Sequence, residues 1–235
     1  LEPDPRKRIS LAEAIIRLNT PHEKAAELIK RVEETNDSED QYQLGFCYSN
    51  GTGVPQSFKK AIELYTLSCE QGNPNAQRGL GYLHNNGSGF PKDPQKAMKY
   101  YQMAADQGDF KALRNLAIMH RYGESIDNDM DKAIELYWKA AERGSESAYF
   151  NLGNIYIHGV DGIEADIPRA IQCFERSAEL GCAQAMFELA VRYVNGNDVE
   201  KDIPKGIKLY TTAASLGDPY SQYNLSRCYS KGNGV

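Results

Sequence analysis

The sequence predicts an all-α fold, a solenoid of stacked helix-turn-helix repeats. A closing glycine recurs at intervals of 36, 36, 37 and 36 residues, at Gly72, Gly108, Gly144, Gly181 and Gly217. Between successive closing glycines, two stretches with helical spacing of apolar residues flank a short turn. A period in this range is typical of solenoids built from helix pairs. The composition, 41% hydrophobic and 25% charged, is that of an ordered chain rather than a disordered one.

The net charge and the shortness of the apolar runs argue against several classes of partner. A net charge of −5 argues against a general phosphate-binding surface, so we expect no nucleic acid partner. No apolar run approaches the roughly 20 residues that span a bilayer, so we expect no membrane insertion. The five cysteines include no Cys-x-x-Cys pair and form an odd number. Single thiols of this kind indicate a reducing, cytoplasmic location.

The first 18 residues do not follow the repeat. They contain the run Asp4-Pro5-Arg6-Lys7-Arg8-Ile9-Ser10. This run resembles the last conserved segment of a protein kinase catalytic domain, D-P-x-x-R-x-S/T, in which the matching arginine pairs with the glutamate of an A-P-E motif. The resemblance implies that residues 1–18 end a kinase domain and that the chain is a fragment of a longer kinase. The alternative is an ordinary helix start, with Ser10 and Glu13 as a capping box.

Residues 19–38 are predicted to form a capping and linker helix before the repeats. Pro21 suits a first turn, and Thr20 or Asn19 is a suitable N-cap. An apolar stripe with helical spacing runs from Ala25 to Val32. A solenoid needs such a segment because a bare end would expose a core face to water.

The repeats are then expected at 39–72, 73–108, 109–144, 145–181 and 182–217, with a partial sixth at 218–235. The first helix of each carries a leucine followed by a small residue, as in Leu80-Gly81. The second helix carries a small residue followed four positions later by an aromatic one, as in Ala97 and Tyr101. The missing side chain on the first helix should let the second pack close, with the aromatic ring filling the space beside it.

This pattern resembles the Sel1-like repeat family, A-x-x-x-L-G-x-x-Y-x-x-G-x-G-V-x-x-D-x-x-K-A-x-x-x-Y-x-x-A-A-x-x-G. The resemblance covers most of the chain and implies a right-handed α-α superhelix related to tetratricopeptide repeats. Glycines of the central turn, as in Gly51-Thr52-Gly53-Val54, are expected to take positive φ. The third and fourth turns depart from the pattern, at 124–129 and 160–162, so their shapes should differ.

No metal, cofactor or catalytic site is expected. Asp127, Asp129 and Asp131 have the spacing of a calcium loop, but the glycine and final glutamate that such a loop needs are missing. A solvated turn that caps the next helix explains them better. His84 and His120 stand where other repeats have tyrosine, and we expect half-buried planar groups rather than metal ligands.

Candidate partner-binding residues lie on the first helices, by analogy with the concave surface of tetratricopeptide proteins. They flank the leucine by two positions or lie one turn further on. Aromatic residues and arginine are enriched at binding hot spots. The alternative for the aromatic members, and for the similar Phe187 and Val191, is packing between repeats. The candidates are Tyr42, Phe46, Arg78, Tyr82, Asn85, Arg114, Ile118, Arg121, Phe150, Asn154, His158, Tyr223 and Arg227.

The leading function is therefore a scaffold or adaptor that binds a protein or peptide on the concave face, C-terminal to a kinase domain. A β-lactam-binding or hydrolysing enzyme is an alternative, because some secreted, cysteine-rich relatives have that activity; the paired cysteines of that branch are missing here. A quality-control adaptor at a membrane is a further alternative.

Overall fold

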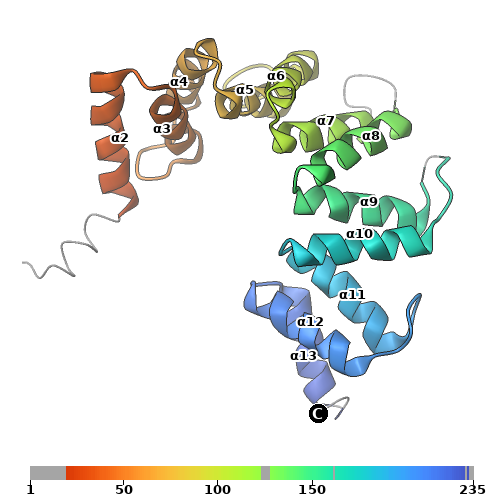
Figure 1. Ribbon diagram of the computed structural model, residues 1–235. Helices are drawn as coiled ribbons and strands as arrows, with labels where there is room; N and C mark the ends of the chain where they lie inside the picture. Colours follow the sequence, from red (N-terminus) through yellow and green to blue (C-terminus); the bar gives the residue numbers. More distant parts are fainter. Residues whose placement is uncertain (1–19, 123–127, 161, 231, 233–235) are drawn as a thin grey trace, which may run out of the picture. The chain divides into compact units, whose positions relative to one another are not determined.

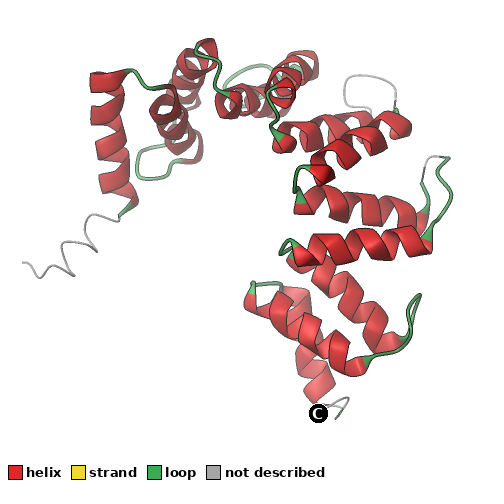
Figure 2. Cartoon of the chain, viewed as in Figure 1, coloured by secondary structure: helices red, strands yellow, loops and turns green. Residues whose placement is uncertain are grey.

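The computed structural model describes residues 20–122, 128–160, 162–230 and 232. This described part of the chain contains twelve α-helices and no strand (Figures 1 and 2). The all-α fold expected from the glycine period is therefore confirmed. The kinase-like motif in residues 1–18 and residues 124–127 of the third central turn lie outside the described residues.

The chain forms two compact units, residues 1–109 and residues 110–235. The helices of unit 1 are α2 (Pro21–Thr35), α3 (Ser38–Asn50), α4 (Phe58–Glu70), α5 (Pro74–Asn86) and α6 (Pro94–Asp106). Those of unit 2 are α7 (Phe110–Tyr122), α8 (Met130–Glu142), α9 (Glu146–His158), α10 (Ile167–Glu179), α11 (Ala183–Asn195), α12 (Ile203–Ser215) and α13 (Pro219–Ser230).

Successive helices pack as antiparallel hairpins within each unit. The close pairs are α3 with α4, α5 with α6, α7 with α8, α9 with α10, and α11 with α12. Each pair also contacts the next helix of its unit, as α4 contacts α5 and α12 contacts α13. We call α3, α5, α7, α9, α11 and α13 the first helices, and α4, α6, α8, α10 and α12 the second helices.

Side-chain caps and glycines set the ends of the helices. Asp129 accepts a hydrogen bond from the backbone N–H of Lys132, which confirms that this aspartate caps the following helix. The closing glycines all have positive φ, between 85° and 96°, and so allow each second helix to turn into the next repeat. Gly51 ends α3 in the left-handed region, whereas Gly159 ends α9 at φ 60° and ψ 122°. The fourth central turn therefore differs in shape, as expected.

The small residues on the first helices allow the close approach that the sequence predicts. A Cβ atom on Gly153 would lie 2.5 Å from the ring of Phe174, and one on Gly45 would lie 2.8 Å from Tyr65. Such distances are well inside van der Waals contact, so these positions accept only glycine while the ring stays in place. The rings of Phe174 and Tyr65 are buried as a result.

Helix α2 begins at Pro21 as expected, and it packs against the first hairpin. The guanidinium of Arg31 donates to both carboxylate oxygens of Asp40, which is buried on α3. At the other end of α2, Nδ1 of His22 lies 2.8 Å from the carbonyl oxygen of Gly53. A Cβ atom on Gly53 would lie 2.0 Å from the carbonyl oxygen of Pro21. The glycine of the central turn therefore lets α2 lie directly over that turn.

Candidate functional site

The thirteen candidate residues all lie on first helices, and we call them the first-helix face of each unit. In unit 1 they are Tyr42, Phe46, Arg78, Tyr82 and Asn85. In unit 2 they are Arg114, Ile118, Arg121, Phe150, Asn154, His158, Tyr223 and Arg227.

Three aromatic residues of this face are exposed. Phe46 is 51% exposed and Tyr82 is 56% exposed in unit 1, and Tyr223 is 64% exposed in unit 2. Because these rings are open to water, they are available to a partner without any rearrangement of the core. Tyrosine in particular supplies a large contact area with one polar atom.

Arg78 is half-buried and held by other side chains. Its Nε donates to Oδ2 of Asp109 at 2.7 Å, and its Nη2 donates to Oδ1 of Asn75 at 2.8 Å. Burial acts to lower the pKa of Arg78, but the hydrogen bond and charge of Asp109, with help from Tyr42, raise it above its ordinary value. The guanidinium is thus part of the structure of unit 1 and is not free to reach a partner.

Two arginines of unit 2 converge on a buried phenol instead. Tyr137 of α8 is fully buried, and its hydroxyl has no hydrogen-bond partner of good geometry among the described residues. Burial raises the pKa of Tyr137 to about 12, whereas the guanidiniums of Arg121 and Arg114 act to lower it. Arg114 donates through Nη2 to Asn115, but its buried Nε is without a partner among the described residues.

Other members of the face serve packing within their own units. Tyr42 stacks on Tyr65 with ring centroids 5.8 Å apart, and Phe150 lies 6.0 Å from Phe174. Phe187 likewise contacts Tyr210 of its own repeat and Tyr220 of the next, so only the contact with Tyr220 is packing between repeats. Three further members are half-buried: Asn85, Ile118 and Asn154. His158, at the end of α9, is exposed.

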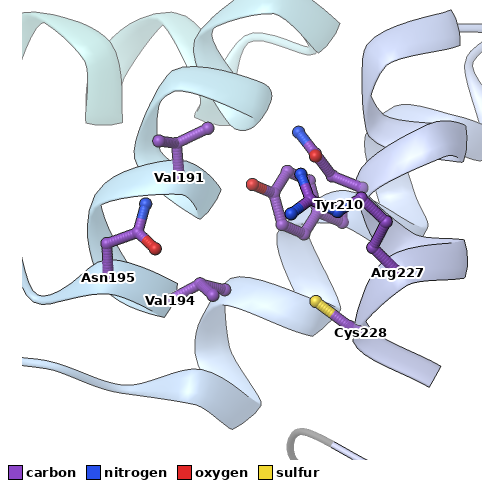
Figure 3. Close-up of a pocket in the computed structure, with 7 residues that line it drawn as sticks. Val191, Val194, Asn195, Tyr210, Arg227 and Cys228 are labelled. Carbon is purple, nitrogen blue, oxygen red and sulfur yellow. The ribbon is translucent and has the colours of Figure 1, made fainter. Parts of the chain in front are cut away.

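A cavity of about 220 Å³ lies among α11, α12 and α13 (Figure 3). Val191, Val194, Asn195, Tyr210, Asn224, Arg227 and Cys228 line it. Only Arg227 belongs to the predicted face. The sequence pattern assigned Tyr210 to the core, and its ring is indeed buried, but its hydroxyl reaches the cavity.

A row of cation–π contacts was missed by the sequence pattern. Lys60 lies 4.8 Å above the ring of Tyr48 in unit 1, and Lys205 lies 4.0 Å above Tyr193 in unit 2. Each lysine directly precedes the small residue of its second helix, and Arg169 occupies the same place over Tyr156. The recurring basic residue was the signal that could have predicted these contacts.

The two histidines occupy this same tyrosine position. His84 is buried and stacks between Phe90 and Tyr100, with centroids 4.1 and 5.6 Å away. Burial, and then the charge of Lys96, lower the pKa of His84. Burial also lowers the pKa of His120. Both therefore favour the neutral form, and the described residues hold no cluster of three or more potential metal ligands.

The chain matches the Sel1 repeat model at 38–73, 74–109, 110–145, 146–182, 183–218 and 219–235, within one residue of the predicted repeats. No curated protein matches the chain. Among solved structures, the Sel1 repeat protein from Oxalobacter formigenes is 29% identical with a TM-score of 0.78, and the match covers 94% of this chain and 85% of that one.

A second similar structure is c5321, a protective antigen of uropathogenic Escherichia coli with an SLR fold. It is 28% identical with a TM-score of 0.74, over 90% of this chain and 45% of that one. The immunity protein PA5088 from Pseudomonas aeruginosa is 26% identical with a TM-score of 0.57, over 79% and 67% of the two chains. This chain thus spans less than half the length of c5321.

These likenesses agree with the helix pairs, the closing glycines and the buried small residues. Repeat proteins of this class generally mediate protein–protein interactions, and their fold is typically a non-catalytic scaffold. No helix in the described part of the chain is both long and apolar enough to cross a bilayer. With six repeat matches that together run from residue 38 to residue 235, the chain belongs to the Sel1 repeat family.

Proposed function

We propose that the protein is a non-catalytic scaffold that binds a protein or peptide partner along the first-helix face of its repeats. The observation that carries this proposal is the exposure of Phe46, Tyr82 and Tyr223, three positions predicted by analogy with the concave surface of tetratricopeptide proteins. Large aromatic side chains supply much of the binding energy in protein interfaces. The net charge of −5 favours a protein over a nucleic acid as partner.

Phe46 supports the proposal because it is exposed yet not isolated. Its ring lies 6.5 Å from Tyr42, which in turn stacks on the buried Tyr65. A ring held by neighbours loses little conformational freedom when a partner covers it, so more of the contact area is converted into affinity.

The test uses a random peptide library displayed on phage and selected on the purified wild-type chain. The best selected peptide is then titrated against Phe46→Ala/Tyr82→Ala and against Leu67→Ala/Met103→Ala. The second variant removes two exposed apolar side chains from the second helices of the same unit, so it is a matched control. The first variant should bind roughly tenfold more weakly or worse, and the control should bind as the wild type does.

Two outcomes would contradict the proposal. Either no peptide is enriched on the wild-type chain, or the control variant loses as much affinity as Phe46→Ala/Tyr82→Ala. Circular dichroism of both variants checks that the helices are kept.

We also propose that the solenoid follows a kinase catalytic domain in the cytoplasm. The run that includes Asp4, Pro5 and Arg8 supports the kinase link, and the five free cysteines support a reducing compartment. Sequencing the reading frame upstream of Leu1 tests the link. H-R-D and D-F-G motifs should be found there, and a frame without them would remove the kinase from the proposal.

A further inference from the structure

The cavity among α11, α12 and α13 is the size of a side chain. Its volume of about 220 Å³ is below the roughly 300–1,000 Å³ of sites that bind small molecules. Val191 and Asn195 of α11 lie on one side of it in Figure 3, and Arg227 of α13 lies on the other, with Tyr210 of α12 between them. A ligand in this cavity would therefore touch three helices at once.

The polar groups that line the cavity can all donate hydrogen bonds. The guanidinium of Arg227 is always charged, and it has no ion pair with any described residue. Arg227 lies over the ring of Tyr223, with the guanidinium carbon 5.7 Å from the centroid. Asn195 and Asn224 each add an amide with two N–H groups. One cation and two amides from different helices form a set of donors suited to an anion.

Tyr210 adds a fourth donor because it stays protonated. Its side chain is 3% exposed, and burial, with a smaller effect of Cys228, raises the pKa of Tyr210 to about 12. The charge of Arg227 and a side-chain hydrogen bond with Asn224 act in the opposite direction. A tyrosine with a pKa this high is neutral at physiological pH and keeps a hydrogen to donate.

The nearby carboxylate does not neutralise the cavity. Glu188 of α11 weakly raises the pKa of Tyr210, but it is ion-paired with Arg192, with Nη1 2.6 Å from Oε2. Arg192 also lies 3.6 Å from Asp198. The charge of Glu188 is thus matched within α11, and Arg227 remains the charge that faces the cavity.

We infer that this cavity is a pocket for a carboxylate and that its occupant is the side chain of a glutamate in a bound peptide. The inference rests on the proposed function, because the peptide is the partner, and it deepens that function by naming the chemistry of one contact. The side chains of Val191, Val194 and Cys228 supply an apolar wall for the two methylene groups of glutamate. A bare inorganic anion would leave that wall uncovered.

The test uses three pentapeptides and the full ¹⁵N-labelled chain. The first is Ac-Ala-Ala-Glu-Ala-Ala-amide, the second has glutamine in place of glutamate, and the third is Ac-penta-alanine with a free carboxyl terminus. Titrations follow the side-chain amide signals of Asn195 and Asn224 and the Nε–H of Arg227. The glutamate peptide should bind roughly tenfold more tightly than the other two, because only it brings a charged acceptor on a flexible stem.

Arg227→Gln should reduce the binding of the glutamate peptide to that of the glutamine peptide. Arg143→Gln is the matched control, because Arg143 is an exposed arginine of the same unit at the end of α8. This control should keep the wild-type preference. Equal binding of the glutamate and glutamine peptides, or equal losses in the two arginine variants, would overturn the inference. Tighter binding of the peptide with the free terminus would show that the occupant is a chain end and would also overturn it.

This outcome is separable from that of the proposed function. Selected peptides that depend on Phe46 and Tyr82, together with no preference for glutamate here, would keep the scaffold and remove the pocket. A preference for glutamate without any dependence on Phe46 and Tyr82 would keep the pocket and remove the first-helix face as the binding surface.

Discussion

Arg78 in unit 1 and Arg114 in unit 2 occupy the same repeat position, two residues before the conserved leucine. Thirty-one residues after Arg78 comes Asp109, which binds its guanidinium. Thirty-one residues after Arg114 comes Ser145, which has no charge and caps α9 instead. The residue just before the next first helix therefore decides whether the arginine is ion-paired, as Arg78 is with Asp109, or lacks that carboxylate, as Arg114 does beside Ser145.

The ends of the hairpins differ between the units in a similar way. In unit 1, Nε2 of Gln107 donates to Oε1 of Gln77 at 2.8 Å. The matching residues of unit 2 are Arg143, which is exposed, and Leu113, which is buried. The polar pair that links the hairpin ends in unit 1 is therefore missing at the matching position of unit 2.

The largest expected change in stability comes from replacing each of the two arginines in turn by alanine. Arg78→Ala should lower the free energy of unfolding by about 2 kcal/mol, because it removes the cation from a carboxylate whose side chain is 9% exposed. Arg114→Ala should cost less than about 1 kcal/mol, because Arg114 has a hydrogen bond to Asn115 but no ion pair among the described residues. Urea unfolding followed by circular dichroism measures both values.

The double variant Arg78→Ala/Asp109→Asn is the control for this pair. It should recover part of the lost stability, since it removes the buried charge along with its partner. Equal losses for Arg78→Ala and Arg114→Ala would mean that the ion pair does not distinguish the two units.

A smaller loss of stability is expected at acid pH. His84 of unit 1 should contribute more of it than His120 of unit 2. Burial and then Lys96 lower the pKa of His84 below its ordinary 6.5, and the charge of Asp93, a smaller effect than that of Lys96, opposes them. At His120, Asp129 opposes burial more strongly than Lys132 supports it. A histidine with a lowered pKa takes up its proton in the unfolded chain first, so stability is full above about pH 6.5 and falls as the pH drops below it.

Replacing each histidine by the tyrosine of the other repeats isolates its share of this loss. The urea midpoint is measured between about pH 7.5 and pH 5.5 for the wild type and both variants. His84→Tyr should flatten the decline more than His120→Tyr does. The same decline in the wild type and in His84→Tyr would assign the acid sensitivity to other groups.

The smallest expected effect is a gain in stability. Ser145→Asp places in unit 2 the carboxylate that unit 1 has at Asp109, and aspartate also caps a helix well. It should raise the free energy of unfolding by no more than about 0.5 kcal/mol through a new pair with Arg114, because Ser145 is 2% exposed and the burial of a carboxylate offsets most of the attraction. The gain should vanish when Ser145→Asp is combined with Arg114→Ala, and a gain that persists would show that it comes from the cap alone.

The sequence predicted the helices, the repeats and the turn glycines well, because each depends on residues within one repeat. Gly153 and Phe174, for example, belong to one hairpin and follow the family pattern. The partner of Arg78 was missed because Asp109 lies 31 residues further along the chain, just before the next first helix, and no spacing within one helix pair indicates it. The hydroxyl of Tyr210 was missed for a different reason: a buried ring carries its polar atom to whatever cavity lies at its edge, and the spacing of residues does not show that edge.

The ion pair between Arg78 and Asp109 has an evolutionary consequence. Serine, asparagine and aspartate are nearly interchangeable before a helix, and this chain uses all three there: Asn73, Ser145 and Asp218. Exchange among them can add or remove the carboxylate that pairs with an arginine 31 residues earlier, and the helix that follows keeps its cap. A substitution just before one helix can therefore change the mobility of an arginine on another helix without replacing that arginine.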